Sequence, residues 1–135
     1  MFNSGSHARH LYGLRLLVVE DEALVAMMLE DMLADLGCIV TGVAGSVAQA
    51  LRILARNGPL DAAILDVNLG GQKIYPVADL LVEREVPFVF CTGYGPLDLM
   101  TRYPMSQVLS KPYLPEALAS VLAECCRNPA PHLRS

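Results

Sequence analysis

Five short apolar runs alternate with helical patterns along this chain, and that alternation limits its fold more than any other feature. The runs occupy residues 14–19, 38–44, 60–65, 86–92 and 106–110. Such alternation is typical of an α/β domain whose parallel sheet is covered by helices on both faces. The hydrophobic fraction of 53% and the mean hydropathy of +0.40 agree with strands that are buried on both faces. With 135 residues, the chain is expected to form one domain.

Helical periodicity follows four of the runs. The first helix is expected over residues 24–36, with an inward face made of Leu24, Val25, Met28, Leu29, Met32, Leu33 and Leu36. Ser46 and Gln49 predict a capping box at the start of the second helix. A third helix is expected over 75–84. The last helix is expected to turn Leu114, Leu118, Val121, Leu122 and Cys125 inward. Glycine and proline interrupt residues 93–105, which predicts a short or irregular fourth helix between the last two strands.

Composition excludes several classes of protein. The net charge of -4 and the lack of a Lys/Arg cluster argue against a nucleic-acid surface. No apolar run approaches the roughly 18 residues that a membrane span needs. Residues 1–13 lack the apolar stretch of a signal peptide, so we expect a flexible extension there and a cytoplasmic protein. The four cysteines are expected to be buried free thiols, and 127–135 is expected to be a flexible tail.

Polar residues follow the apolar runs at their carboxyl ends. Glu20 and Asp21 follow the first run, Asp66 follows the third, Thr92 ends the fourth and Lys111 follows the fifth. The carboxyl ends of parallel strands meet at one edge of the sheet, which is where ligands bind in such folds. Three carboxylates placed together repel one another unless a cation is present. Because all of these ligand atoms are oxygens, Mg²⁺ is the expected ion.

The same residues predict phosphoryl transfer to a carboxylate. Asp66 is the expected nucleophile, Lys111 supplies a fixed positive charge, and the hydroxyl of Thr92 can donate to a phosphoryl oxygen. Each residue alone is more often a helix cap or a solvated turn residue, so the prediction depends on their joint placement. A phosphatase of the haloacid dehalogenase type also uses such an aspartate, but it needs a second acid two residues later, where this chain has Asn68.

The segments LLVVEDE, ILDVNLGG, FCTGY and LSKPY, in this order and spacing, resemble the receiver domain of two-component response regulators. The resemblance covers residues 14–126. It implies a doubly wound, flavodoxin-like sheet of five parallel strands in the order 2-1-3-4-5. It also implies that Asp66 accepts a phosphoryl group from a histidine kinase.

The resemblance also assigns the other site residues. Asp21 and Asp66 would bind Mg²⁺ directly, Glu20 would act through water, and Asn68 would contribute its backbone carbonyl. Thr92 would follow the phosphoryl group after transfer, and Lys111 would neutralise it.

Phe90-Cys91-Thr92-Gly93-Tyr94 is similar to the motif of the FAT GUY receivers, with Cys91 in place of the usual alanine. That subgroup occurs mainly in alphaproteobacteria, alongside HWE-type and related histidine kinases. Ordinary receivers carry a switching aromatic residue three positions before the lysine, where this chain has Val108. We therefore expect that ordering of residues 93–105 replaces the aromatic swing, with Tyr94 as the candidate lever.

The expected function is a phosphorylation-dependent signalling switch that acts by contact with proteins. A sensor histidine kinase, with the HWE type as a candidate, or a phosphotransfer protein would supply the phosphoryl group, and a downstream protein would read it. Two alternatives stay open: a phosphate sink without an output partner, and an unphosphorylated pseudo-receiver scaffold. The chain is not expected to be an enzyme beyond Mg²⁺-dependent self-phosphorylation and slow self-dephosphorylation. The sequence leaves open whether it forms a homodimer.

Overall fold

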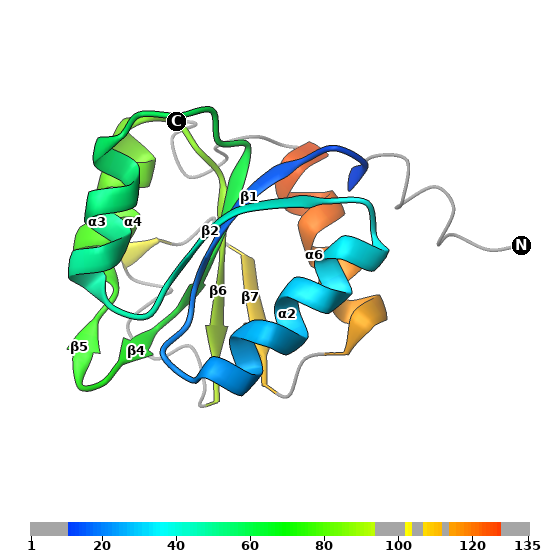
Figure 1. Cartoon of the computed structure of the whole chain (residues 1–135), viewed down its shortest axis with the longest axis horizontal. Coiled ribbons are helices and arrows are strands. Elements are labelled where there is room, and N and C mark those ends of the chain that lie inside the picture. The colour runs from blue at the N-terminus through cyan, green and yellow to red at the C-terminus, as the bar shows by residue number, and fades with distance from the viewer. Residues whose placement is uncertain (1–10, 94–101, 104–106, 112–113, 128–135) are drawn as a thin grey trace, which may run out of the picture.

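A central parallel sheet organises the molecule (Figure 1). The computed structural model describes residues 11–93, 102–103, 107–111 and 114–127. The strands of the sheet are β1 (Arg15–Val19), β2 (Ile39–Ala44), β3 (Ala62–Asp66), β6 (Phe88–Thr92) and β7 (Gln107–Ser110). They pair in the order β2-β1-β3-β6-β7, and every pair is parallel. In order along the chain this is 2-1-3-4-5, so the predicted fold class is confirmed.

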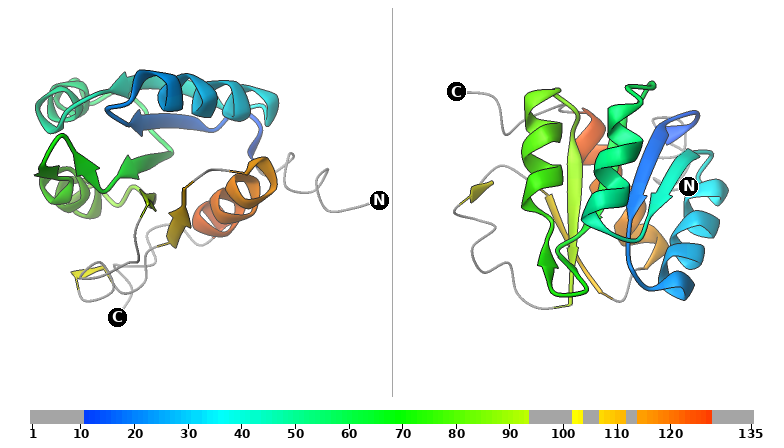
Figure 2. Two further views of the ribbon diagram at one scale, coloured as in Figure 1. Left: turned by 90° about the horizontal axis from the view of Figure 1, so that it is seen from below. Right: turned by 60° about the vertical axis from the view of Figure 1, so that its left-hand side comes forward.

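Helices cover both faces of the sheet (Figures 1 and 2). On one face lie α2 (Ala23–Asp35) and α6 (Pro115–Arg127), and on the other lie α3 (Val47–Ala55) and α4 (Tyr75–Glu83). Most of residues 93–105, where a short fourth helix is expected, lie outside the described residues.

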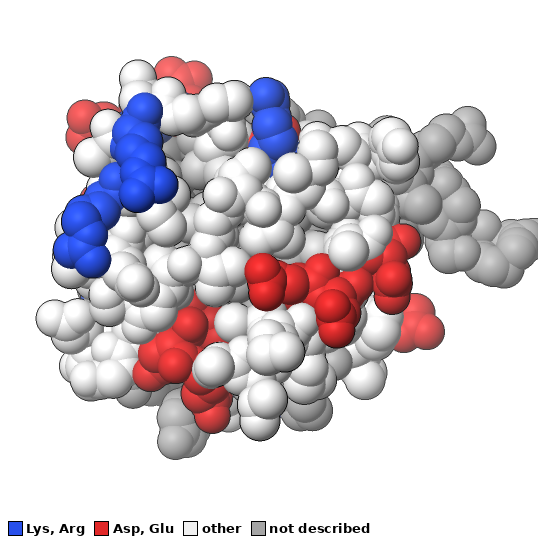
Figure 3. All heavy atoms as spheres, in the orientation of Figure 1, with Lys and Arg blue, Asp and Glu red and all other residues white. Residues whose placement is uncertain are grey.

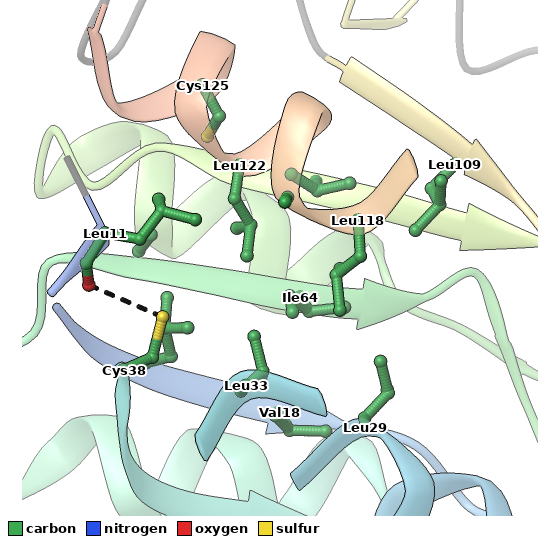
Figure 4. Packing of buried hydrophobic residues seen from close by; sticks show 14 of the residues in the cluster. Leu11, Val18, Leu29, Leu33, Cys38, Ile64, Leu109, Leu118, Leu122 and Cys125 are labelled. Carbon is green, nitrogen blue, oxygen red and sulfur yellow. Dashed lines mark hydrogen bonds between the residues drawn. The ribbon is translucent and has the colours of Figure 1, made fainter. Parts of the chain in front are cut away.

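The core has two halves because successive strand residues point to opposite faces. Along β1, Leu16 and Val18 pack into the cluster beneath α2 and α6, whereas Leu17 and Val19 pack into the cluster beneath α3 and α4. Figure 4 shows the first cluster, in which the Cys38 thiol lies 3.5 Å from the carbonyl oxygen of Leu11. Leu11 falls within the expected extension over 1–13, yet its side chain is fully buried. The packed part of the chain therefore includes Leu11.

The start of α3 differs slightly from the predicted capping box. The Ser46 hydroxyl accepts a bond from the Gln49 amide N–H at 3.1 Å, as expected. The Gln49 side chain, however, accepts from the amide N–H of Gly45 at 2.7 Å, one residue before the N-cap. The two bonds still hold the turn after β2 against the first turn of the helix.

Three residues that were predicted to face inward are exposed. Leu24 is 75% exposed, Met28 is 52% exposed and Leu114 is 61% exposed. The stripe of α2 that faces the sheet includes the small residue Ala26 together with Leu29 and Leu33, so Leu24 and Met28 lie on the opposite side of the helix. Leu114 precedes the first residue of α6 and therefore does not share its inward face.

A small hairpin that is not among the predicted elements follows β3. Its strands are β4 (Asn68–Leu69) and β5 (Gln72–Lys73), joined by Gly70 and Gly71. Both glycines have positive φ, of 55° and 89°, which two-residue hairpin turns of this kind require. A Cβ at Gly70 would lie 3.9 Å from an Asp21 carboxylate oxygen, so the hairpin turn lies beside the end of β1.

Tyr103 anchors a part of the chain between β6 and β7. Its ring packs against Phe88, Phe90 and Tyr75, and its hydroxyl donates to Asp79 on α4 at 2.5 Å. The guanidinium of Arg102 lies 4.1 Å from the centre of the Tyr75 ring. These contacts fix residues 102–103 against α4 and β6.

All four cysteines are free thiols, as predicted, although Cys126 is only half-buried. None of the helices in the described part of the chain is long and apolar enough to cross a bilayer.

Candidate functional site

The carboxyl ends of four strands bring the predicted site residues to one edge of the sheet. Glu20 follows β1, and its amide N–H bonds to the Ala44 carbonyl at 2.9 Å, which continues the pairing with β2. Asp66 is the last residue of β3 and Thr92 is the last residue of β6. Lys111 follows β7, and its amide N–H bonds to the Thr92 carbonyl at 3.0 Å.

Three acidic side chains gather at this edge. Oxygens of Glu20, Asp21 and Asp66 all lie within 4.8 Å of one another. Glu20 and Asp66 are almost fully buried, whereas Asp21 is exposed. Figure 3 shows acidic side chains gathered low on the molecule, near the end of β1 in Figure 1. The expected convergence of these acids is therefore present in the fold.

Lys111 lies between the two buried carboxylates. Its ammonium nitrogen is 3.3 Å from a carboxylate oxygen of Glu20 and 3.3 Å from one of Asp66. A longer contact of 4.0 Å reaches Glu22, which sequence reasoning did not include in the site. The amide N–H of Glu22 also donates to the Glu20 carboxylate at 3.1 Å. The only sequence signal for Glu22 was its place in the acidic run after β1.

Burial and neighbouring charges shift the pKa values of Asp66 and Lys111. Burial raises the pKa of Asp66 to about 6, the negative charge of Glu20 adds to the increase, and Lys111 opposes it. Burial opposes the charge of Lys111 as well, but the two carboxylates outweigh it and raise the pKa of the ammonium. Asp66 is thus a buried carboxylate whose ionised form needs a nearby positive charge.

The donor set fits a hard divalent cation. Three carboxylates within reach of one another, one of them open to solvent, offer oxygen ligands and leave room for water. Of the other predicted ligands, Asn68 lies in β4, two residues after Asp66. Asp21, Asp66 and Glu20 are therefore the residues that could hold Mg²⁺.

Thr92 is buried at the end of β6, next to the strand that carries Asp66. In the sheet register, Asp66 pairs with Cys91, so Thr92 stands one residue beyond the acid. Val108 is partly buried in the same core cluster as Tyr103. Tyr94, the predicted lever, lies outside the described residues.

Comparisons with known proteins agree with this architecture. Residues 16–123 match the model of the response regulator receiver domain. Among characterised relatives, the phyllosphere-induced regulator PhyR of Methylorubrum extorquens is 33% identical over 112 residues, which are 81% of this chain and 42% of PhyR. The transcriptional regulatory protein PdtaR of Mycobacterium tuberculosis is 33% identical over 65% of this chain and 43% of its own length. The chain thus spans less than half the length of these relatives.

Solved structures of response regulators are also similar to this chain. The solution structure of SdrG from Sphingomonas melonis Fr1 is 45% identical, with a TM-score of 0.72, and the match covers 84% of this chain and 95% of SdrG. A crystal structure of the PhyR stress response regulator is 25% identical, with a TM-score of 0.79, over 98% of this chain and 51% of that one. Fold, site and family model agree, and the chain belongs to the receiver domain family of response regulators.

Proposed function

We propose that this receiver domain is a phosphorylation-driven signalling switch in which Asp66 accepts a phosphoryl group from a phosphohistidine. The observation that carries the proposal is the position of Lys111, whose ammonium lies 3.3 Å from Asp66 at the carboxyl edge of the sheet. A sensor histidine kinase or a phosphotransfer protein would be the donor, in the cytoplasm. We take 14–126 as the receiver domain, with Leu11 of the preceding segment packed into its core.

Asp66 is better suited to be the acceptor than its two acidic neighbours. Glu20 holds the amide of Glu22 and the ammonium of Lys111, and its side chain is only 1% exposed. Asp21 is exposed and makes no contact with Lys111 within salt-bridge distance. In the reaction, an oxygen of Asp66 forms a bond to phosphorus as the bond from phosphorus to the histidine nitrogen breaks, and the imidazole leaves with its electron pair.

The three carboxylates would hold Mg²⁺ next to the acceptor. Asp21 and Asp66 would bind it directly, Glu20 would act through water, and the backbone carbonyl of Asn68 would complete the protein ligands. When bound, the ion would neutralise negative charge on the phosphoryl oxygens. The close approach of the three acids supports this assignment, because such a cluster is stabilised by a divalent cation.

Lys111 and Thr92 would act on the phosphorylated form. Lys111 already contacts Asp66, so a small movement of its flexible side chain would bring it to a phosphoryl oxygen. Thr92 would donate its hydroxyl to another of these oxygens, and Tyr94 would act as the lever that reports the change. The chain would do no chemistry beyond its own phosphorylation and slow dephosphorylation, and a downstream protein would read its state.

Exposed apolar side chains beside the site support a protein donor. Leu24 is the second residue of α2, which begins directly after the acidic run, and Met28 lies one turn further along. Leu114 follows Lys111 by three residues and is exposed as well. Exposed apolar side chains that form a contiguous patch mark surfaces that bind proteins. We therefore assign these three residues to the surface that receives the donor, and we place the chain in the FAT GUY subgroup, with an HWE-type kinase as the candidate donor.

The direct test is phosphorylation by a small donor. The protein is incubated with acetyl phosphate and Mg²⁺, and intact mass spectrometry followed by peptide mapping locates the modification. We expect one phosphoryl group on Asp66, none on Asp66→Asn, and normal modification of Asp31→Asn, which removes an exposed acid elsewhere. Absence of phosphate from the wild type would leave the pseudo-receiver scaffold.

A second experiment separates a switch from a phosphate sink. Immobilised wild-type protein and Asp66→Asn are compared as baits after treatment with acetyl phosphate. A partner that is retained only by the phosphorylated wild type supports the switch. Equal retention on both baits, together with efficient phosphorylation, supports the sink.

A further inference from the structure

The edge of the sheet formed by β2 presents an uncharged surface. β2 is the terminal strand, and the side chains of Ile39 and Val43 on it are 52% and 37% exposed. From Gly37 to Leu51 the sequence contains no charged residue. Edge strands of soluble proteins usually carry charges or proline, which prevent association through the edge. The edge of β2 has neither.

Opposite charges flank this edge on its two sides. α2 carries Glu30, Asp31 and Asp35 in its C-terminal half, and α3 carries Arg52 near its end, with Arg56 as its C-cap. Figure 3 shows the result in the orientation of Figure 1, where an uncharged band separates acidic side chains over α2 from basic side chains over α3. We call the uncharged band on β2, together with the acidic side chains of α2 and the basic side chains of α3 that flank it, the β2 face.

The charges of the β2 face have no partners among the described residues. No ion pair joins any of the five side chains to another residue in the part of the chain that the structure describes. The acids of α2 are also placed unfavourably, because the carboxyl end of a helix carries partial negative charge and the last turn of α2 contains no basic residue. A cationic surface against α2 would relieve this repulsion.

We infer that the β2 face binds a second copy of this chain. A twofold axis parallel to β2 places α3 of the second copy beside α2 of the first copy. The same axis places α2 of the second copy beside α3 of the first. Each acidic side then faces a basic side, and the uncharged bands around Val43 meet at the axis. An interface of this kind is self-complementary, as a twofold dimer requires.

The charges disfavour the alternative, in which the two β2 strands pair directly. If two β2 strands joined antiparallel in one continuous sheet, the axis would be perpendicular to the sheet and α3 would lie beside α3. Arg52 and Arg56 would then face Arg52 and Arg56 of the second copy, and the acids of α2 would face the same acids of the second copy. Like charges placed opposite one another disfavour that arrangement.

The dimer should be weak and sensitive to salt. The apolar contribution comes from a few partly exposed side chains on a single strand, and the remaining attraction is between solvent-exposed charges. Such charges are screened beyond about 8–10 Å at physiological ionic strength. The face does not include Asp66 or Lys111, so the association does not depend on the proposed phosphorylation.

Sedimentation velocity of the complete chain is the test. We expect wild-type protein to show a concentration-dependent dimer at up to about 1 mM, and to lose it as sodium chloride is raised. Arg52→Glu/Arg56→Glu makes both sides of the face acidic, and Asp31→Lys/Asp35→Lys makes both sides basic. Each variant alone should be monomeric, and an equimolar mixture of the two should dimerise again, because every acidic side then meets a basic one.

Controls separate this result from loss of folding. Circular dichroism and acceptance of phosphate from acetyl phosphate report whether each variant is folded. Glu116→Lys/Glu124→Lys reverses two charges on α6, away from the face, and should leave the dimer unchanged. Three results would overturn the inference: a wild-type monomer at every concentration, dimers of either reversed variant alone, or a mixture that stays monomeric.

Discussion

The ammonium of Lys111 lies 3.3 Å from Asp66 and equally close to Glu20, so one cation serves two carboxylates that are otherwise buried at the end of the sheet. The strands that carry these residues are not adjacent in sequence, and they meet because all of them are parallel. Without the lysine, two negative charges would face each other in a poorly solvated site. The lysine therefore affects the stability of the domain as well as its chemistry.

Replacement of Lys111 by methionine should destabilise the metal-free protein. The substitution keeps the length of the side chain but leaves Glu20 and Asp66 without their cation. Because the side chain of Lys111 is 23% exposed, the penalty should lie between that of an exposed pair and that of a fully buried pair, at about 1–2 kcal/mol. Urea unfolding at pH 7.5 in EDTA measures it. Lys73→Met, on the hairpin, should change the free energy of unfolding much less, and equal losses in both variants would contradict the role of Lys111.

Asp66→Asn should have the opposite effect and stabilise the metal-free protein. A folded-state pKa of about 6, above the ordinary value of 3.8, means that ionised Asp66 destabilises the fold at neutral pH. The gain should be about 1–2 kcal/mol after allowance for solvent screening and for the lost attraction to Lys111. The stabilisation by Asp66→Asn should be complete above about pH 6. It should be absent below about pH 4, where Asp66 of the wild type is protonated in both the folded and the unfolded state.

Thermal unfolding of the two proteins across this pH range measures the effect. Mg²⁺ should narrow the difference at neutral pH, since the ion stabilises the wild type more than the amide variant. A less stable Asp66→Asn in EDTA at pH 7.5 would contradict the pKa shift.

The strands and the site were predictable for a common physical reason. A parallel sheet buries both faces of each strand, so its strands appear as continuous apolar runs, and β3 is buried along its whole length. Polar residues directly after such runs must lie at the carboxyl edge, which is why Glu20, Asp66 and Lys111 could be grouped without a structure. The sharing of one lysine between two acids could not be predicted, because it depends on side-chain positions.

Other features were not predicted, because helical periodicity does not indicate which of two apolar faces of a helix packs against the sheet. On α2, the spacing of Leu24 and Met28 fits a helical stripe as well as the spacing of the buried residues does, and only packing against the sheet selects Ala26, Leu29 and Leu33. The contact between Tyr103 and Asp79 joins residues that are 24 positions apart, and no local pattern indicates it. The hairpin after β3 did have a signal, the Gly70-Gly71 pair.

Tyr103→Phe should weaken the anchor between α4 and the segment before β7. The phenylalanine ring keeps the aromatic contacts but loses the bond to Asp79, which should lower the free energy of unfolding by about 1 kcal/mol. Tyr103→Ala also removes the ring, which is 6% exposed, and should lower it by about 3 kcal/mol.

Urea unfolding of both variants gives these values, with Tyr12→Phe as the control, since Tyr12 is 80% exposed. Absorbance titration gives an independent reading. Burial, together with the bond to Asp79, raises the pKa of Tyr103 to about 12, so the most alkaline phenol ionisation should be missing from Tyr103→Phe. An unchanged titration curve would contradict the assignment.

Asp61→Asn should reduce stability at neutral pH, and less in acid. Asp61 accepts bonds from the side chain of Arg15 at 2.9 and 3.1 Å and from its amide N–H at 2.8 Å. The side-chain bond to Arg15 lowers the pKa of Asp61 below its ordinary 3.8, so the stabilisation is present above that value and is lost as pH falls through the folded-state pKa. The effect should be small, because both side chains are partly exposed.

Thermal unfolding at pH 7 and at pH 3, in low and high salt, tests this pair. The difference between wild type and Asp61→Asn should shrink at pH 3. Glu116→Gln, an exposed acid on α6 outside any ion pair that the described residues form, serves as the control. A difference that stays constant with pH would mean that packing, rather than charge, accounts for it.

The double variant Leu24→Ser/Met28→Ser should slow phosphotransfer from a protein donor but not phosphorylation by a small-molecule donor. Both side chains are exposed, so their replacement should leave the fold intact. If they form the centre of the surface that receives the donor, loss of both should slow phosphotransfer at least about tenfold, since the few residues at the centre of an interface cost more than about 1 kcal/mol each when truncated. Acetyl phosphate does not use that surface, so its rate with the variant should match the wild type.

The measurement is phosphotransfer profiling with purified, radiolabelled sensor kinases from the source organism, followed by acetyl phosphate kinetics on the same preparations. Tyr12→Ser removes a side chain that is 80% exposed on a different part of the surface and should slow neither reaction. Equal slowing of both donors by Leu24→Ser/Met28→Ser would indicate damage to the acceptor site itself. Normal transfer from the preferred kinase would contradict the assignment of Leu24 and Met28 to the surface that receives the donor.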